Sequence, residues 1–388
     1  RMTVALVQRG HDVHVLLPAK TNETIDHEGV TVHRVVPLWD RRMILDRFDR
    51  FFKKELYQPY QEVKSAWCLW RRWKQLKREL AFDLVQLANV QGVGLFFRRE
   101  RQVPVVLRMS SYRPQWDTLA GVEVHRGTRL RWWVERKVAE ATPCIYAPSH
   151  HVARQVETNY RVPSVSVIES PFFQEQMTED PAAYEEYGKA GPYCLFFGRM
   201  TQMKGVHVLA DALPDVLRRQ PDMRVLFVGR GDAAAPNGQP MREYVRSRAG
   251  EYADRIELVE SMRHDRLYPI VRHARFVVLP SLADNLPNTC LESMGLGKVV
   301  VATTGSCFEQ LIEDGFSGFL VEAGEPAPLA EAMVRAWNLS EQVRARMGEA
   351  AEQRIRQLHP DVAVPALIDY YQSRVLNGRA RQQTGVSG

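Results

Sequence analysis

Two Rossmann-like α/β domains in tandem are the architecture that this sequence predicts. The chain has 388 residues, more than one hydrophobic core ordinarily holds, so two domains are expected. Short apolar runs recur along it with helical stretches between them, which indicates doubly wound, mostly parallel sheets. A polar junction at about residues 171–192 separates one series of strands from the next.

The first series of predicted strands follows the end of a helix. Gly10 suits a left-handed helix terminus, and residues 12–17 then alternate between apolar and polar as a half-buried strand does. Because the chain starts inside that helix, we expect a strand, a glycine-rich loop and the first helical turns to precede Arg1, on the order of 20–30 residues by the length of a βαβ unit. The remaining strands of this series are predicted at residues 31–36, 84–87, 105–107, 144–147 and 166–168.

The second series begins after the junction. Its strands are predicted at residues 193–197, 224–228, 255–259, 276–279, 299–302 and 318–321. The domains are therefore expected to span residues 1–172 and 173–359, with a C-terminal helix at 360–377 completing the first. The polar tail after Asn377 is expected to be disordered.

Composition narrows the classes of function. No apolar run reaches the roughly 18 residues of a membrane span. The net charge of +6 comes without a nucleic-acid-binding motif, so we expect a basic surface that meets anionic lipid or phosphorylated substrates, and no nucleic acid. The five widely spaced cysteines predict reduced, mostly buried thiols in a cytoplasmic protein, and neither a disulfide set nor a zinc site.

A first candidate site follows the strand at 193–197. Gly198 allows a ligand close to the backbone, and Arg199 and Lys204 place two cations at the carboxyl edge of a parallel sheet. A forked guanidinium beside a compact ammonium suits a diphosphate. The alternative is that both cations are merely solvated.

A second candidate site follows the strand at 276–279. Asp284 lies in a loop, a helix begins near Asn288, and Glu292 follows about one turn later. Free N–H groups at a helix start can hold a phosphate or sugar oxygen, and a carboxylate can accept paired ribose hydroxyls. The alternative is that Glu292 is only a favourable charge near the helix N-terminus.

With these two stretches, the sequence resembles the retaining glycosyltransferases of family 4. That family has G-R-x-x-x-x-K-G, E-x7-E and G-x-P-V-V-A segments, to which residues 198–205, Asp284 with Glu292, and residues 297–302 correspond. Turns similar to the family's V-G-x-G, G-G-x-x-E and D-G-x-x-G lie at residues 225–231, 305–309 and 314–318, so the order and spacing hold over most of residues 190–326. The resemblance implies the GT-B architecture, with two Rossmann-like domains facing each other across a cleft.

The resemblance also implies roles for individual residues. Arg199 and Lys204 would bind the diphosphate of a UDP or GDP sugar, Asp284 would contact the donor sugar, and these three would be the catalytic residues. Glu292 would hold the ribose hydroxyls. No metal and no cofactor are implied, in agreement with the absence of an Asp-x-Asp pair near the site. The implied donor-binding residues are Gly198, Arg199, Lys204, Gly229, Asp284, Asn285, Leu286, Pro287, Asn288, Thr289 and Glu292.

The acceptor side departs from the family pattern. A histidine common in the family after the strand matching 105–107 is missing, and the candidates there are Arg108, Ser110, Ser111 and Arg113. His150 and His151 follow a helix cap at Ser149 and are expected to be structural. Asp284 replaces the family's commoner glutamate. The activity implied is sugar transfer to a hydroxyl acceptor; the alternatives are an inactive nucleotide-sugar-binding protein or another GT-B enzyme such as a sugar-nucleotide epimerase.

A basic aromatic helix at residues 66–80 suggests a further partner. On a helical projection Leu69, Trp73, Leu76 and Leu80 form the core face. The opposite face predicts contact with an anionic membrane, or else packing under residues 44–52. It holds Trp67, Trp70, Arg71, Lys74, Lys77 and Arg78.

Overall fold

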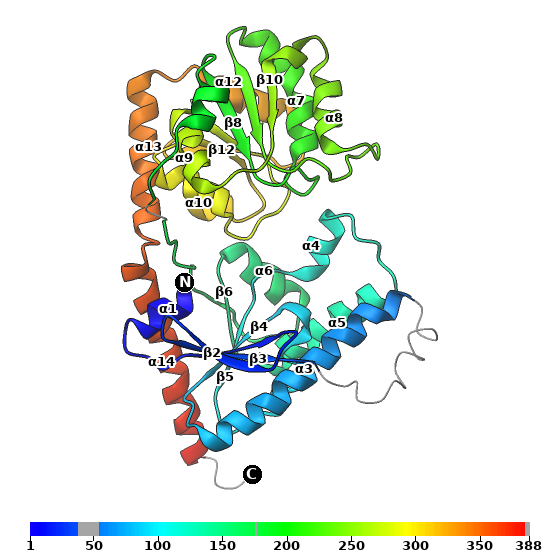
Figure 1. Cartoon of the computed structure of the whole chain (residues 1–388), viewed down its shortest axis with the longest axis vertical. Helices are drawn as coiled ribbons and strands as arrows, with labels where there is room; N and C mark the ends of the chain where they lie inside the picture. Colours follow the sequence, from blue (N-terminus) through cyan, green and yellow to red (C-terminus); the bar gives the residue numbers. More distant parts are fainter. Residues whose placement is uncertain (38–53, 175–176, 385–388) are drawn as a thin grey trace. The chain divides into compact units, whose positions relative to one another are not determined.

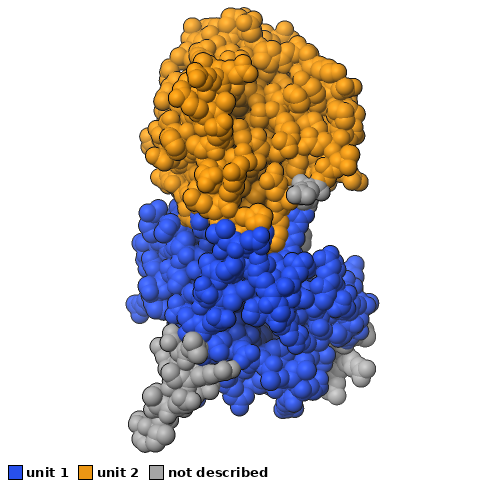
Figure 2. Space-filling view, turned by 90° about the vertical axis from the view of Figure 1, so that its left-hand side faces the viewer, with its two compact units in different colours: residues 1–171, 360–388 blue, residues 172–359 orange. Residues whose placement is uncertain are grey.

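The structure is a computed structural model that describes residues 1–37, 54–174 and 177–384. The chain divides into two compact units, residues 1–171 with 360–388 and residues 172–359 (Figure 2). All five cysteines are free thiols and four are buried, as the composition predicted. Among the helices of the described residues, none is long and apolar enough to cross a membrane.

The second unit contains one six-stranded sheet in which every neighbouring pair is parallel. Its order, β10-β9-β8-β11-β12-β13, becomes 3-2-1-4-5-6 when the strands are counted within the unit, which is the Rossmann order. Three strands have their predicted bounds, and the other three begin one residue late. The strands are β8 (Tyr193–Phe197), β9 (Arg224–Val228), β10 (Ile256–Val259), β11 (Val277–Leu279), β12 (Val300–Thr303) and β13 (Gly318–Val321).

Alternate side chains of these strands enter two separate hydrophobic cores. Phe196 and Phe227 face one core and Leu195 and Leu226 face the other, so both faces of the sheet are covered and the strands are apolar at nearly every position. Helices α7 (Val206–Arg219), α8 (Met241–Ala249) and α12 (Pro326–Trp337) cover the first face. The second face is covered by α9 (His264–His273), α10 (Asn288–Gly295), α11 (Phe308–Leu311) and α13 (Glu341–Arg356) (Figure 1).

The first unit contains two sheets that share no strand pairing in the described residues. The larger is a parallel sheet in the order β4-β5-β6-β7, with β4 (Val85–Ala88), β5 (Val105–Arg108), β6 (Cys144–Ala147) and β7 (Ser166–Val167). The smaller has the order β1-β3-β2, with β1 (His14–Pro18), β2 (Glu23–His27) and β3 (Val30–Val35). Helices α1 (Met2–Val7), α3 (Lys54–Glu79), α4 (Arg113–Leu119), α5 (Arg126–Ala141) and α6 (His150–Asn159) belong to the same unit.

The β2–β3 hairpin was not predicted. Strand β2 pairs antiparallel with β3, and both turn residues, Glu28 and Gly29, have positive φ angles. Strand β2 is mostly exposed and polar, with only Ile25 partly buried, so it lacks the apolar alternation that identifies a half-buried strand. The pairing with β3 therefore decides its conformation.

The C-terminal helix α14 (Pro360–Thr384) packs within the first unit. Its Leu367 and Tyr370 join a core with Val106 and Tyr146, and Arg9 forms an ion pair of 2.8 Å with Asp361. The prediction that the tail after Asn377 is disordered is wrong as far as Thr384, because helix α14 continues to that residue. Residues 379–383 are good helix formers by composition.

In helix α3, part of the face that was expected to contact a membrane is buried. Trp70 is 7% exposed and packs edge to face on Phe97, with ring centroids 5.1 Å apart, so it belongs to the core. Lys77 lies beside it on the helix and forms an ion pair of 2.8 Å with the nearly buried Glu100. Trp67 and Arg71 are exposed. Residues 44–52, the alternative cover for this face, lie outside the described residues.

Candidate functional site

The predicted donor residues gather where the strand order of the second unit reverses. Strands β8 and β11 are neighbours, and the loop after each leads to a helix on an opposite face of the sheet. In open α/β sheets, ligands bind outside the carboxyl ends of the strands at this switch point. The two motifs found in the sequence are these two loops.

Glycines allow the loops to approach one another. Gly205 has φ +65°, and a Cβ atom there would lie 1.7 Å from the carbonyl oxygen of Pro280. A Cβ atom on Gly229 would lie 1.9 Å from the carbonyl oxygen of Gly198. The N–H of Leu282 also donates a 2.9 Å hydrogen bond to the carbonyl oxygen of Met203. Only residues without a side chain fit at the two glycine positions.

Lys204 and Asp284 form an ion pair, which the sequence did not predict. Lys204 Nζ donates to Asp284 Oδ2, and the Lys204 and Asp284 side chains are 24% and 7% exposed. The same carboxylate accepts the backbone N–H of Asn285 at 3.0 Å and the hydroxyl of Ser281 at 3.4 Å. Asp284 is thus held in a fixed orientation, and it neutralises the ammonium that was expected to meet a phosphate.

Arg199 is an exposed cation of this edge. Its side chain is exposed, and it has no ion-pair partner in the part of the chain that the structure describes. Arg199 directly follows Gly198, whose φ is +128°. Its guanidinium is therefore available to an anionic ligand.

The start of helix α10 offers backbone N–H groups at the same edge. Asn288 and Thr289 are its first two residues, and N–H groups at such positions have no acceptor within the helix. Leu286 precedes them with a left-handed φ of +69°, and its N–H donates a 2.9 Å hydrogen bond to Cys307 Sγ. Of the amides expected to meet the donor, that of Leu286 is therefore already engaged.

Glu292 lies on the first turns of α10 and is 9% exposed. Its Oε1 lies 3.8 Å from His264 Nε2, and the imidazole stacks on Tyr268 with ring centroids 5.5 Å apart. Burial raises the pKa of Glu292, while the nearby His264 opposes that rise. His264 was not among the predicted site residues, and its only local signal is its place at the start of the helix after β10.

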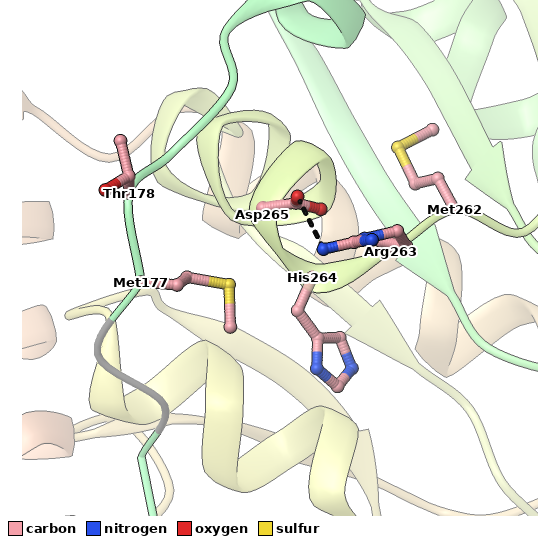
Figure 3. Close-up of a pocket in the computed structure, with 6 residues that line it drawn as sticks. All are labelled: Met177, Thr178, Met262, Arg263, His264 and Asp265. Atoms are coloured by element: carbon pink, nitrogen blue, oxygen red, sulfur yellow. Dashed lines mark ion pairs between the residues drawn. The ribbon is translucent and has the colours of Figure 1, made fainter.

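A cavity of about 500 Å³ adjoins this pair (Figure 3). Its polar side contains the ion pair between Arg263 and Asp265, at 3.2 Å, and the imidazole of His264 projects on the side away from that pair. The lining residues are Met177, Thr178, Met262, Arg263, His264 and Asp265. Pockets of this size and mixed polarity hold small ligands.

On the acceptor side, three candidates form hydrogen bonds with neighbouring groups. Arg108 donates a 2.8 Å hydrogen bond to Ser170 Oγ, and the N–H of Ser110 donates to the buried Asn89, which in turn donates to the carbonyl oxygen of Ser111. These bonds fix the loop at the carboxyl end of β5. None of them occupies the hydroxyl groups of Ser110 and Ser111.

Arg113, the fourth acceptor-side candidate, is held by two carboxylates of its own unit. Its guanidinium contacts Glu135 at 2.5 Å and Asp117 at 3.3 Å and is 16% exposed, so it anchors α4 to α5. Ser149 accepts the N–H of Val152 at 3.3 Å, which confirms the predicted helix cap. His151 is 8% exposed and its Nε2 lies 3.2 Å from the side-chain oxygen of Gln115, as expected for a structural residue.

No group of three or more His, Cys, Asp or Glu side chains within the described residues could hold a metal ion.

Comparisons with known proteins place both parts of the chain among glycosyltransferases. Residues 191–338 match the model of the glycosyl transferases group 1, and residues 1–171 match that of glycosyltransferase family 4. The chain is 25% identical over 374 residues to a phosphatidyl-myo-inositol mannosyltransferase of Mycobacterium leprae, covering 95% of this chain and 90% of that one. It is 26% identical to an α-D-kanosaminyltransferase of Streptomyces kanamyceticus, covering 76% and 79% of the two chains.

Solved structures show the same fold at lower identity. Sucrose-phosphate synthase from Thermosynechococcus elongatus matches with a TM-score of 0.72 at 16% identity, covering 96% of this chain and 91% of that one. Anabaena HepE in complex with UDP and glucose matches with a TM-score of 0.65 at 16% identity, covering 93% and 100%. The two Rossmann-like units therefore form the GT-B architecture that the sequence predicted.

Proposed function

This chain belongs to glycosyltransferase family 4, the glycosyl transferases group 1, and from that premise we propose that it moves a sugar from a nucleoside diphosphate donor to a hydroxyl acceptor with retention of configuration. The observation that carries the proposal is the set of Arg199, Lys204, Asp284 and Glu292 at the switch point of the second unit. A UDP or GDP sugar is the proposed donor.

The donor diphosphate would lie between Arg199 and the first turn of α10. Arg199 supplies a guanidinium without an ion-pair partner in the described residues, and Asn288 and Thr289 supply N–H groups strengthened by the helix dipole. Lys204 is shared: part of its charge is neutralised by Asp284 until a phosphate competes for it. The bound diphosphate would thus be gripped mainly by Arg199 and the helix start.

The nucleoside would occupy the cavity beside Glu292. The Glu292 carboxylate is fixed by burial and by His264, and it can accept two vicinal hydroxyls of a ribose. The approximately 500 Å³ cavity begins at the same histidine, which is where a base joined to that ribose would enter.

In the proposed reaction, the bond between the sugar C1 and the β-phosphate oxygen breaks, and negative charge grows on that oxygen. Arg199, Lys204 and the α10 amides stabilise this charge, as fixed donors do in other electrostatic sites. The departing phosphate takes the proton of the acceptor hydroxyl, which attacks C1 from the same face, so configuration is retained. Asp284 would orient a hydroxyl of the transferred sugar, and the acceptor would meet Arg108, Ser110 and Ser111. We propose that this charge stabilisation needs no metal ion.

The test is a panel of UDP, GDP, ADP and dTDP sugars in a thermal-shift measurement, followed by product analysis. A donor at 100 times its dissociation constant stabilises the protein by about 2.7 kcal/mol. With the stabilising donor, NMR should show transfer to a hydroxyl or slow hydrolysis, with the released sugar in its original anomeric form. Binding without turnover on any acceptor would favour the inactive binding protein, and an epimerised nucleotide sugar would assign the other enzyme class. Stabilisation by none of the donors would refute the proposal.

A further inference from the structure

Helix α5 presents an exposed apolar stripe on the side opposite its buried face. Leu130 and Trp133 are 39% and 52% exposed, while Val134, Glu135 and Val138 are buried on the other side. The residues three and four apart on a helix share one side, so Leu130 and Trp133 form a stripe with Arg126 and Lys137. We call Arg126, Arg129, Leu130, Trp133 and Lys137 the α5 face.

The loop before this helix extends the apolar surface. Val122 and Val124 are 39% and 42% exposed and lie just ahead of Arg126. Helix α5 runs beside α3 (Figure 1), so closely that a Cβ atom on Gly127 would lie 1.8 Å from the carbonyl oxygen of Glu55. The packing of α5 on α3 thus fixes which side of α5 faces outward.

The charges around the stripe are mostly positive. Arg126 and Arg129 are exposed and have no carboxylate partner in the described part of the chain. Lys137 and Arg136 share one carboxylate, Glu140, at 2.8 and 2.6 Å. Glu123, which is exposed, and Glu55, whose carbonyl oxygen lies against Gly127, are acids of the same neighbourhood. Arg126 and Arg129 are therefore the charges of the stripe that no carboxylate of the described residues pairs.

We propose that the α5 face docks on an anionic lipid bilayer. Trp133 and Leu130 enter the boundary between headgroups and acyl chains, and Arg126 and Arg129 contact lipid phosphates. An exposed tryptophan among arginines on one side of a helix suits an interface that is apolar below and charged above.

Two other surfaces with aromatic side chains differ from the α5 face, one on helix α3 and one around Phe316. On helix α3, which the sequence favoured for the role, Trp70 is buried and Trp67 packs edge to face on Phe96, with ring centroids 5.1 Å apart. Phe316 is 60% exposed but belongs to the second unit, where Glu313 and Asp314 precede it in place of basic residues. The α5 face therefore combines exposed apolar area and positive charge in a way that these sites do not.

The test is co-sedimentation of the full chain with vesicles of equal parts phosphatidylcholine and phosphatidylglycerol, against vesicles of phosphatidylcholine alone. The wild type should bind the anionic vesicles and be released by salt. Each basic residue near an anionic surface contributes roughly fivefold to partitioning, so Arg126→Glu with Arg129→Glu should lower it at least about 25-fold. Leu130→Ser with Trp133→Ser should lower it at least about tenfold, since buried apolar area sets the affinity.

Phe316→Ser is the matched control, since Phe316 is 60% exposed and outside the α5 face; it should bind like the wild type. Trp133→Phe keeps the apolar contact, and it should retain vesicle binding while losing part of the tryptophan quenching by brominated lipid. This variant keeps the test valid if a serine variant misfolds.

Absence of wild-type binding, equal binding to both vesicle types, or unchanged binding of the α5-face variants would each overturn the proposal. If the wild type instead forms a dimer that Trp133→Ser abolishes, the α5 face contacts a second copy and the lipid proposal is wrong.

Discussion

From the ion pair between Lys204 and Asp284 we predict that variants of the two residues change protein stability and ligand affinity in different ways. Lys204→Met removes the ammonium and keeps most of the side-chain volume, leaving Asp284 charged at 7% side-chain exposure. Loss of one partner of a fully buried pair costs about 3–5 kcal/mol. Because the Lys204 side chain is 24% exposed, water screens part of this cost and we expect about 2–3 kcal/mol. For a unit of this size that corresponds to a Tm lower by roughly 4–12 °C.

Asp284→Asn gives the opposite pattern. The lysine left behind is partly exposed, so stability should change little. Its ammonium is no longer shared, so affinity for a nucleoside diphosphate should rise severalfold, whereas turnover should fall because the carboxylate is gone. The double variant Lys204→Met with Asp284→Asn should regain most of the stability that Lys204→Met loses, but it should not regain the diphosphate affinity.

Calorimetric titration with UDP and GDP and differential scanning fluorimetry on the four proteins measure both quantities. Competition between Asp284 and a phosphate for Lys204 is refuted if Asp284→Asn weakens diphosphate binding as much as Lys204→Met does. We attribute the lower Tm of Lys204→Met to the unpaired charge of Asp284. This explanation is refuted if the Tm losses of the two single variants simply add in the double variant.

Further predictions concern other groups of the site and one buried acid. Arg199→Ala should weaken nucleoside diphosphate binding roughly ten- to hundredfold and nucleoside binding little. It should not lower Tm, because Arg199 is exposed and has no ion-pair partner in the described residues. Equal losses of affinity for both ligands in a titration would contradict this role. Glu292→Gln should cost donor affinity, and a 2′-deoxyribose donor should then show little further loss; additive losses would mean that Glu292 does not touch the ribose. Turnover should survive EDTA, and a loss that magnesium or manganese restores would contradict the metal-free proposal. Burial raises the pKa of Glu135 to about 7 against the attraction of Arg113, so the folded chain holds this proton more tightly than the unfolded chain. The free energy of unfolding that this group contributes is then fully present below about pH 4.5 and is lost as the pH rises through about 7. Glu135→Gln should therefore flatten the fall of Tm between these two pH values. An unchanged slope would show that Glu135 stays ionised beside Arg113.

Local sequence accounts for the second unit almost completely. Its strands are buried on both faces, so each is a continuous apolar run that needs no partner to be identified. The same holds for the two loops with charged residues, since each directly follows such a strand. The charged side chains there stand just beyond the apolar runs, at the carboxyl ends of the strands, and this position is what made them candidates.

Other features depend on neighbours far apart in sequence. Lys204 meets Asp284 because β8 and β11 are adjacent, and that adjacency follows from the strand order, which no local pattern encodes. His264 reaches Glu292 because helices α9 and α10, which carry them, cover the same face of the sheet.

The faces of helices also depend on tertiary packing. Trp70 lies about 100° from Leu69 on the helical projection, at the margin of the core face, and Phe97 covers it there. Arg113 was expected at a ligand, but Glu135 of the next helix and Asp117 of its own hold it. A side chain at the margin of a face is buried or exposed according to what packs against it, and that is fixed only when the chain folds.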